Sequence, residues 1–100
     1  MIIIYSTYPN KEEAKLMAKA LLEAKLIACA NIYPIESLYN WENKIQDEIE
    51  FVLWTKSDES KKDEIMNFID KKHSYDVPCV VSLNMDSTSN YSNWVRNELI

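Results

Sequence analysis

The sequence contains no glycine among its 100 residues, whereas an average domain of this length carries about seven. The absence excludes the P-loop and the dinucleotide G-x-G-x-x-G loop, because both need glycine where the backbone approaches a phosphate. Tight turns therefore have to be made by Asn, Asp, Ser or Pro. Asn43 lies between two strand-like runs, and we predict that it takes the left-handed conformation of a hairpin turn.

Basic residues are also scarce, at 11 against 16 acidic residues, and the net charge is −5. This balance argues against nucleic acid and against an anionic membrane surface as partners. No apolar run approaches the length of a transmembrane helix, and Ile2–Tyr5 is too short and lacks the basic flank of a signal peptide. We therefore expect a cytoplasmic protein in which Cys29 and Cys79 are free thiols.

Histidine occurs once, as His73, at the end of a predicted helix. One histidine per chain cannot form a closed zinc site of four ligands, and no nucleophile–base pair stands out, so we expect no catalysis. His73 is a candidate ligand for copper or zinc, or alternatively a solvated cation at the negative end of the helix dipole. Cys79 follows six residues later and could share a soft ion with it, or be a buried strand residue.

The remaining patterns predict one domain, residues 1–100, in the order βαββαβ with a short helix at the C-terminus. Asn10 and Glu13 form a variant of the capping box, and an amphipathic helix follows them to about Lys25. A second helix is expected near Ser60–Lys72, capped by Ser57 or Ser60. The strands are expected near Ile2–Tyr5, Ala28–Trp41 with a bulge or edge position at Pro34, Ile45–Lys56 and Val77–Leu83.

Right-handed crossovers between these elements favour a ferredoxin-like α+β sandwich whose antiparallel sheet has the strand order 4-1-3-2. Cys29 and Cys79 then lie on opposite edges of the sheet, too far apart for a disulfide within one chain.

The hairpin made by the second and third strands is too long for this domain. Its arms of about 12 residues extend roughly 40 Å, whereas a helix of about 14 residues covers only about 21 Å. The outer half carries Tyr39, Trp41 and other apolar residues that a monomer would not normally expose. Either a partner subunit receives it, with Tyr39 and Trp41 as interface anchors, or Pro34 bends it back over its own sheet.

Four ordered motifs resemble the CutA divalent-cation tolerance proteins over essentially the whole chain. The resemblance implies a ferredoxin-like fold with a long hairpin, a homotrimer similar to the PII signalling proteins, and a link to copper and other divalent cations, without established catalysis. The alternative is a structural trimer, or one that binds a protein partner, with no physiological metal site. The motifs are Ser6–Asn10, Ala28–Pro34, Tyr39–Ile45 and His73–Pro78.

The resemblance also points to site residues. It makes His73 and Cys79 the candidate metal ligands, with copper as the implied ion. By analogy with PII-like trimers, Lys56, Tyr75 and Asp76 are expected to line a ligand cleft between subunits.

The chain departs from the family pattern at four positions. Asn43 stands where the family has a glycine at the hairpin tip, which a turn with positive φ allows. Ser74 and Cys79 replace a proline and a glutamate of the family pattern. Ser6 replaces a cysteine that some members carry, which puts a family-type copper site in doubt.

Two carboxylates, Glu48 and Glu50, share one face of the third strand, with Asp47 on the other. Such a pair can bind hard cations or act in acid–base chemistry. More commonly it is part of a solvated strand face, which is the interpretation that we expect here.

Overall fold

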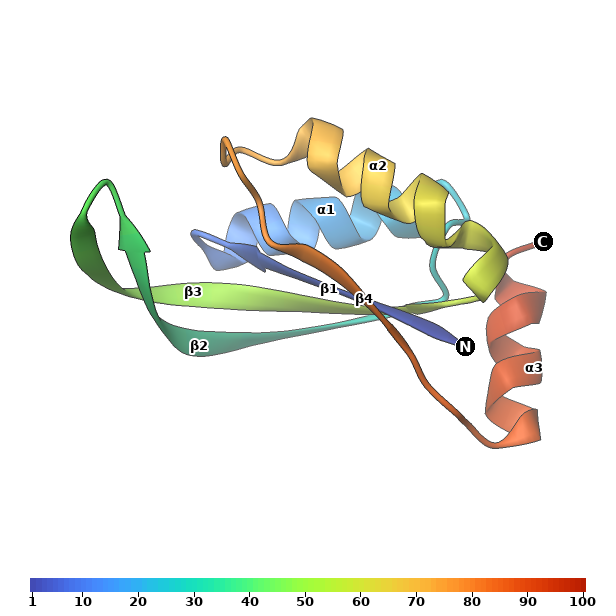
Figure 1. The fold of residues 1–100 in the computed structure, drawn as a ribbon. Coiled ribbons are helices and arrows are strands. Elements are labelled where there is room, and N and C mark those ends of the chain that lie inside the picture. The colour runs from blue at the N-terminus through green and yellow to red at the C-terminus, as the bar shows by residue number, and fades with distance from the viewer.

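A computed structural model describing residues 1–100 shows a four-stranded antiparallel sheet with the order β2-β3-β1-β4 (Figure 1). This confirms the predicted α+β class, the order of elements and the strand order. The elements are β1 Ile2–Tyr8, α1 Lys11–Glu23, β2 Cys29–Trp41, β3 Lys44–Ser57, a 3-10 turn at Glu59–Lys61, α2 Lys62–Lys72, β4 Val80–Asn84 and α3 Ser89–Glu98.

Helices α1 and α2 cover one face of the sheet, and α3 lies at its end beside the C-terminus (Figure 1). Alternate residues of each strand point toward the helices, and the core forms where they pack against the apolar stripes of α1 and α2. On the apolar side of α1, Leu22 stays 40% exposed, whereas four residues are buried: Ala14, Met17, Ala18 and Leu21. The other face of the sheet has no helix layer, so its side chains are free to form a site. The core residues are Ile2, Ile4, Tyr8, Ala14, Met17, Ala18, Leu21, Leu26, Ile27, Leu53, Ile65 and Ile69.

The helices begin at polar caps. Asn10 accepts a hydrogen bond from the backbone N–H of Glu13 at 2.9 Å, which confirms the predicted start of α1. The predicted cap of α2 by Ser57 or Ser60 is wrong. Asp58 caps the 3-10 turn before α2 by accepting from the N–H of Ser60, because Ser57 is the last residue of β3 and donates to the carbonyl of Leu26.

Three residues other than glycine take the left-handed conformation. At the hairpin tip Glu42 and Asn43 have φ of 52° and 64°, as a two-residue type I′ turn requires, so the prediction for Asn43 is confirmed and Glu42 was missed. Lys25, with φ of 60°, ends α1 in a Schellman motif: its N–H donates to Leu22 O and that of Leu26 donates to Leu21 O. Glycine usually fills such positions, since a Cβ there costs about 1–2 kcal/mol.

The hairpin pairs without interruption from Cys29 opposite Lys56 to Trp41 opposite Lys44. Pro34 causes no bulge, because β2 is an edge strand and the missing N–H can face away from the ladder. Figure 1 shows the hairpin running beyond the ends of α1 and α2 and curling at its tip. Leu38 and Ile45 are 70% and 76% exposed there. Pro34 therefore does not bend the hairpin back onto its own sheet.

Strand β4 begins at Val80 rather than at the predicted Val77. Pro78 has no N–H to donate to the ladder, and the segment before Val80 stays unpaired. Both cysteines are free, and the strand order places them at opposite edges of the sheet, as predicted. None of the helices is long and apolar enough to cross a membrane.

Candidate functional site

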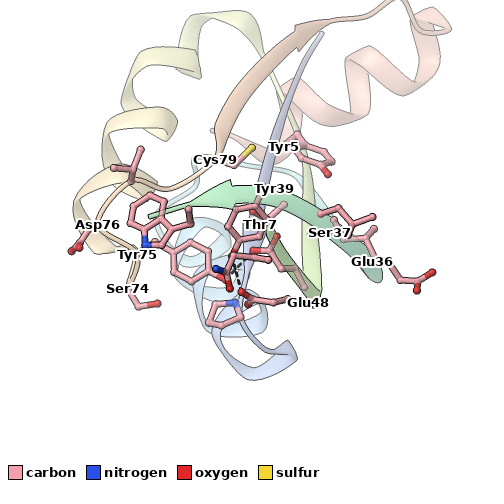
Figure 2. Close-up of a pocket in the computed structure, with 17 residues that line it drawn as sticks. Tyr5, Thr7, Glu36, Ser37, Tyr39, Glu48, Ser74, Tyr75, Asp76 and Cys79 are labelled. Carbon is pink, nitrogen blue, oxygen red and sulfur yellow. Dashed lines mark hydrogen bonds between the residues drawn. The ribbon is translucent and has the colours of Figure 1, made fainter. Parts of the chain in front are cut away.

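An open cavity of about 860 Å³ lies between the outer half of the hairpin and the segment that joins α2 to β4 (Figure 2). Its base comes from β1, where Tyr5 and Thr7 point away from the helices because their neighbours Ile4 and Tyr8 point into the core. The lining residues from the hairpin are Ile35, Glu36, Ser37, Leu38, Tyr39, Trp41, Gln46, Glu48 and Glu50, and those from the segment are Ser74, Tyr75, Asp76, Val77 and Cys79.

Two tyrosine–carboxylate pairs meet in this cavity. The hydroxyl of Tyr39 donates to Glu48 Oε1 at 2.9 Å, and that of Tyr75 donates to Glu50 Oε2 at 2.8 Å. The hydrogen bond to Glu48 raises the pKa of Tyr39. Burial, and then the bond to Glu50, raises the pKa of Tyr75. Both phenols therefore stay protonated donors at neutral pH, and each fixes the orientation of a carboxylate.

Glu50 is only 7% exposed, so its interpretation as part of a solvated strand face was wrong. The reason is Tyr75, which reaches across from the segment after α2 and covers the carboxylate while donating to it. The lining holds the four carboxylates of Glu36, Glu48, Glu50 and Asp76 and includes no Lys, Arg or His. The cavity is accordingly a region of negative charge.

His73 stands at the C-terminal end of α2, where its side chain is held from two sides. Its Nδ1 accepts from the N–H of Tyr75 at 3.1 Å, so the proton of the neutral ring lies on Nε2. Nε2 donates to the carbonyl of Thr7 at 2.6 Å, and the ring stacks on Tyr8 with centroids 4.5 Å apart. Because both nitrogens are engaged, the imidazole has no lone pair free for a metal in this conformation.

Cys79 lies elsewhere, in the wall of the large cavity beside Tyr5 (Figure 2), whereas His73 lines a smaller cavity of about 190 Å³ next to α1. Partial burial, followed by the charge of Glu50, raises the pKa of the Cys79 thiol and so disfavours the thiolate that a metal needs. The structure brings together no group of three or more His, Cys, Asp or Glu that could hold a metal. His73 and Cys79 do not fit a metal site within one chain, and a site shared between subunits stays a prediction.

The residues predicted for a cleft are only partly brought together. Tyr75 and Asp76 line the large cavity, whereas Lys56 lies beside α3 with its Nζ 5.7 Å from the ring centroid of Tyr91. Tyr39 and Trp41, the predicted interface anchors, also line the cavity and remain 38% and 46% exposed. That Lys56 joins Tyr75 and Asp76 in a cleft between subunits stays a prediction.

The two tyrosine–carboxylate pairs were not predicted. One signal was present, because Ser37 pairs with Glu48 in the hairpin and Tyr39 is therefore the diagonal neighbour of that carboxylate. No comparable signal existed for Tyr75 and Glu50, which are 25 residues apart and meet only through the tertiary fold.

A four-stranded antiparallel sheet with two helices on one face, and with an extended hairpin beside a ligand-sized cavity, defines an α+β protein of the ferredoxin-like class. The chain belongs to the family of the CutA1 divalent ion tolerance protein, whose model matches residues 2–98. The divalent-cation tolerance protein CutA of Thermotoga maritima is 36% identical over 101 residues, which cover all of both chains. The chloroplastic protein CutA of Arabidopsis thaliana is 39% identical over 96% of this chain, which spans only about half, 54%, of that plant protein.

Solved structures agree with this assignment. The periplasmic divalent cation tolerance protein CutA of Archaeoglobus fulgidus superimposes with a TM-score of 0.95 and 36% identity, over 100% of both chains. The PII-like protein CutA of a Nostoc species, in its apo form, superimposes with a TM-score of 0.92 and 28% identity, over 100% of this chain and 98% of the other.

Proposed function

We propose that the protein acts in divalent-cation tolerance as a non-catalytic, cytoplasmic homotrimer of the PII-like type, with the cavity beside the hairpin as its ligand site. A relative that covers the whole chain is named for divalent-cation tolerance, and one structural neighbour is the PII-like protein CutA of a Nostoc species.

The observation that carries the homotrimer is the outer half of the hairpin. It runs past the helices that cover the rest of the sheet and keeps large apolar side chains in solvent (Figure 1). In a closed ring of identical subunits each subunit would receive the hairpin of a neighbour, so no hairpin would be left uncovered. The exposed large apolar side chains of the hairpin are Tyr33, Leu38, Tyr39, Trp41, Ile45 and Ile49.

The proposal is tested by placing a charge on the hairpin and an equal charge on a helix. Leu38 of the hairpin and Leu16 of α1 are 70% and 67% exposed, so they form a matched pair. Leu38→Lys should shift the sedimentation profile toward the monomer at micromolar concentration, because the ammonium group would be buried in the interface. Leu16→Lys should leave it unchanged. Equal profiles for the two variants would contradict the assignment of the hairpin to the interface.

The contacts of His73 favour a second candidate function, that of a trimer that binds a protein partner and holds no metal on this histidine. Its two nitrogens already serve the carbonyl of Thr7 and the N–H of Tyr75. Calorimetric titration of copper into the wild type, His73→Gln and Cys79→Ser separates the two functions. Weaker copper binding in both variants supports the metal site, whereas equal affinity in all three proteins supports the partner-binding trimer.

A further inference from the structure

We propose that the cavity beside the hairpin binds a small organic ammonium ion, best matched by a linear diamine, between Glu48, Glu50 and the rings of Tyr39 and Tyr75. The proposal rests on the proposed function only for the role of this cavity as a ligand site. It does not depend on copper, and because Tyr39 and Trp41 are also the proposed interface anchors, it concerns the cavity as the assembled protein presents it.

The charge of the cavity is the first argument. Glu50 is 7% exposed and receives one hydrogen bond, from the neutral phenol of Tyr75. A phenol orients a carboxylate but does not neutralise it, and a buried carboxylate without a counter-charge is unfavourable. No basic residue of the same chain lines the cavity. A cation that enters from solvent would supply the missing positive charge.

The aromatic lining decides between an organic cation and a metal ion. Tyr5, Tyr39, Trp41 and Tyr75 line the cavity, and aromatic faces attract ammonium groups while their edges pack against alkyl chains. A hard divalent metal needs about six converging oxygen ligands, but here each of Glu48 and Glu50 already directs one oxygen to a phenol. The remaining oxygens can accept N–H bonds from an ammonium group, which needs no complete coordination shell.

The spacing of the carboxylates suggests a diamine. Glu48 and Glu50 are alternate residues on one face of β3, so their backbone positions are about 7 Å apart. An extended four-carbon diamine can place one nitrogen at each carboxylate and its methylene chain between the rings. Figure 2 shows Tyr39, Tyr75 and Glu48 directed into the middle of the cavity, while the side chains of Glu36 and Asp76 point outward. The outward pair therefore contributes to the charge of the lining but does not contact the proposed ligand position.

The test is calorimetric titration of the full-length protein with 1,4-diaminobutane and, as a control of equal length without charge, 1,4-butanediol. We expect saturable binding of the diamine and no measurable heat from the diol. Glu48→Gln and Glu50→Gln should each weaken diamine binding by about tenfold or more, the value of a lost charge-assisted hydrogen bond. Asp47→Asn removes the same charge from the exposed residue next to Glu48, on the opposite face of β3 and outside the cavity lining, and should change the affinity by less than about twofold.

Glu48 is exposed, so Glu48→Gln keeps the test decisive even if Glu50→Gln does not fold. Equal binding of diamine and diol, an equal loss in Asp47→Asn and Glu48→Gln, or absence of diamine binding would each overturn the proposal. Zinc chloride as a further titrant separates the alternatives, because zinc bound through Glu48 without any diamine binding would make the site inorganic. The mass of the same samples by light scattering tests the proposed homotrimer separately, so the two proposals can fail independently.

Discussion

Removing one oxygen atom from Tyr75 tests the most unusual contact of the structure, the burial of the Glu50 carboxylate. In Tyr75→Phe the ring remains to cover the cavity, but the 2.8 Å hydrogen bond to Glu50 is lost. A hydrogen bond to a charged group is worth about 1.5–3 kcal/mol, and a buried acceptor left without a partner adds its own desolvation cost. Glu50 is 7% exposed, so water cannot fully replace the phenol. We expect the free energy of unfolding to fall by about 3 kcal/mol.

Tyr39→Phe is the matched control, because it removes the same atom from the same kind of pair in a more open position. Tyr39 is 38% exposed and Glu48 is exposed as well. Water can take over that hydrogen bond, so the loss should be much smaller than for Tyr75→Phe.

Urea denaturation followed by tryptophan fluorescence measures both changes. With a slope of about 2 kcal/mol per molar urea, Tyr75→Phe should lower the midpoint by about 1.5 M, and Tyr39→Phe should lower it by much less. All proteins are compared at one subunit concentration, since assembly adds to apparent stability. Equal small shifts for the two variants would refute the reasoning, because the burial of Glu50 would then have no energetic consequence.

Three further changes have defined outcomes. Lys25→Gly should raise the free energy of unfolding by about 1 kcal/mol, because glycine adopts the left-handed conformation without the steric cost of a Cβ. Ala24 has a φ of −78°, so Ala24→Gly should lower the free energy of unfolding in the same thermal melts. Burial raises the pKa of Tyr8 from 10.0 to about 12. The contribution of the protonated hydroxyl to the free energy of unfolding is therefore complete below pH 10 and is lost as the pH rises toward 12. In urea denaturation at several pH values, Tyr8→Phe should show a smaller loss of stability over this range. Trp41→Ala should weaken assembly in dilution experiments, and Trp94→Ala, at a similar 44% exposure, should not.

The sequence sufficed for much of the fold because local and nonlocal signals agreed there. The capping pair Asn10 and Glu13, the stripe of α1 and the order of the elements left one topology that satisfied the crossover rules. The errors lay where tertiary contacts overrode a local preference. Ser57 was expected to cap a helix, but its hydroxyl is used by the carbonyl of Leu26.

The candidate site was less predictable, since its residues come from three parts of the chain. Period-2 alternation correctly put Glu48 and Glu50 on one face. It could not reveal that Tyr75, from the segment after α2, would bury Glu50. His73 was selected as a ligand by residue type, yet the closeness of β1 engages its Nε2 at the carbonyl of Thr7. In both cases the deciding partner is distant in sequence.

The central claim is that the exposed outer half of the hairpin forms the subunit interface of a homotrimer. Multi-angle light scattering on the eluting native protein, repeated over a dilution series, tests it most directly. Three chains of 11.7 kDa predict a single species of about 35 kDa that persists on dilution. A monodisperse species of 11.7 kDa at all concentrations would contradict the account.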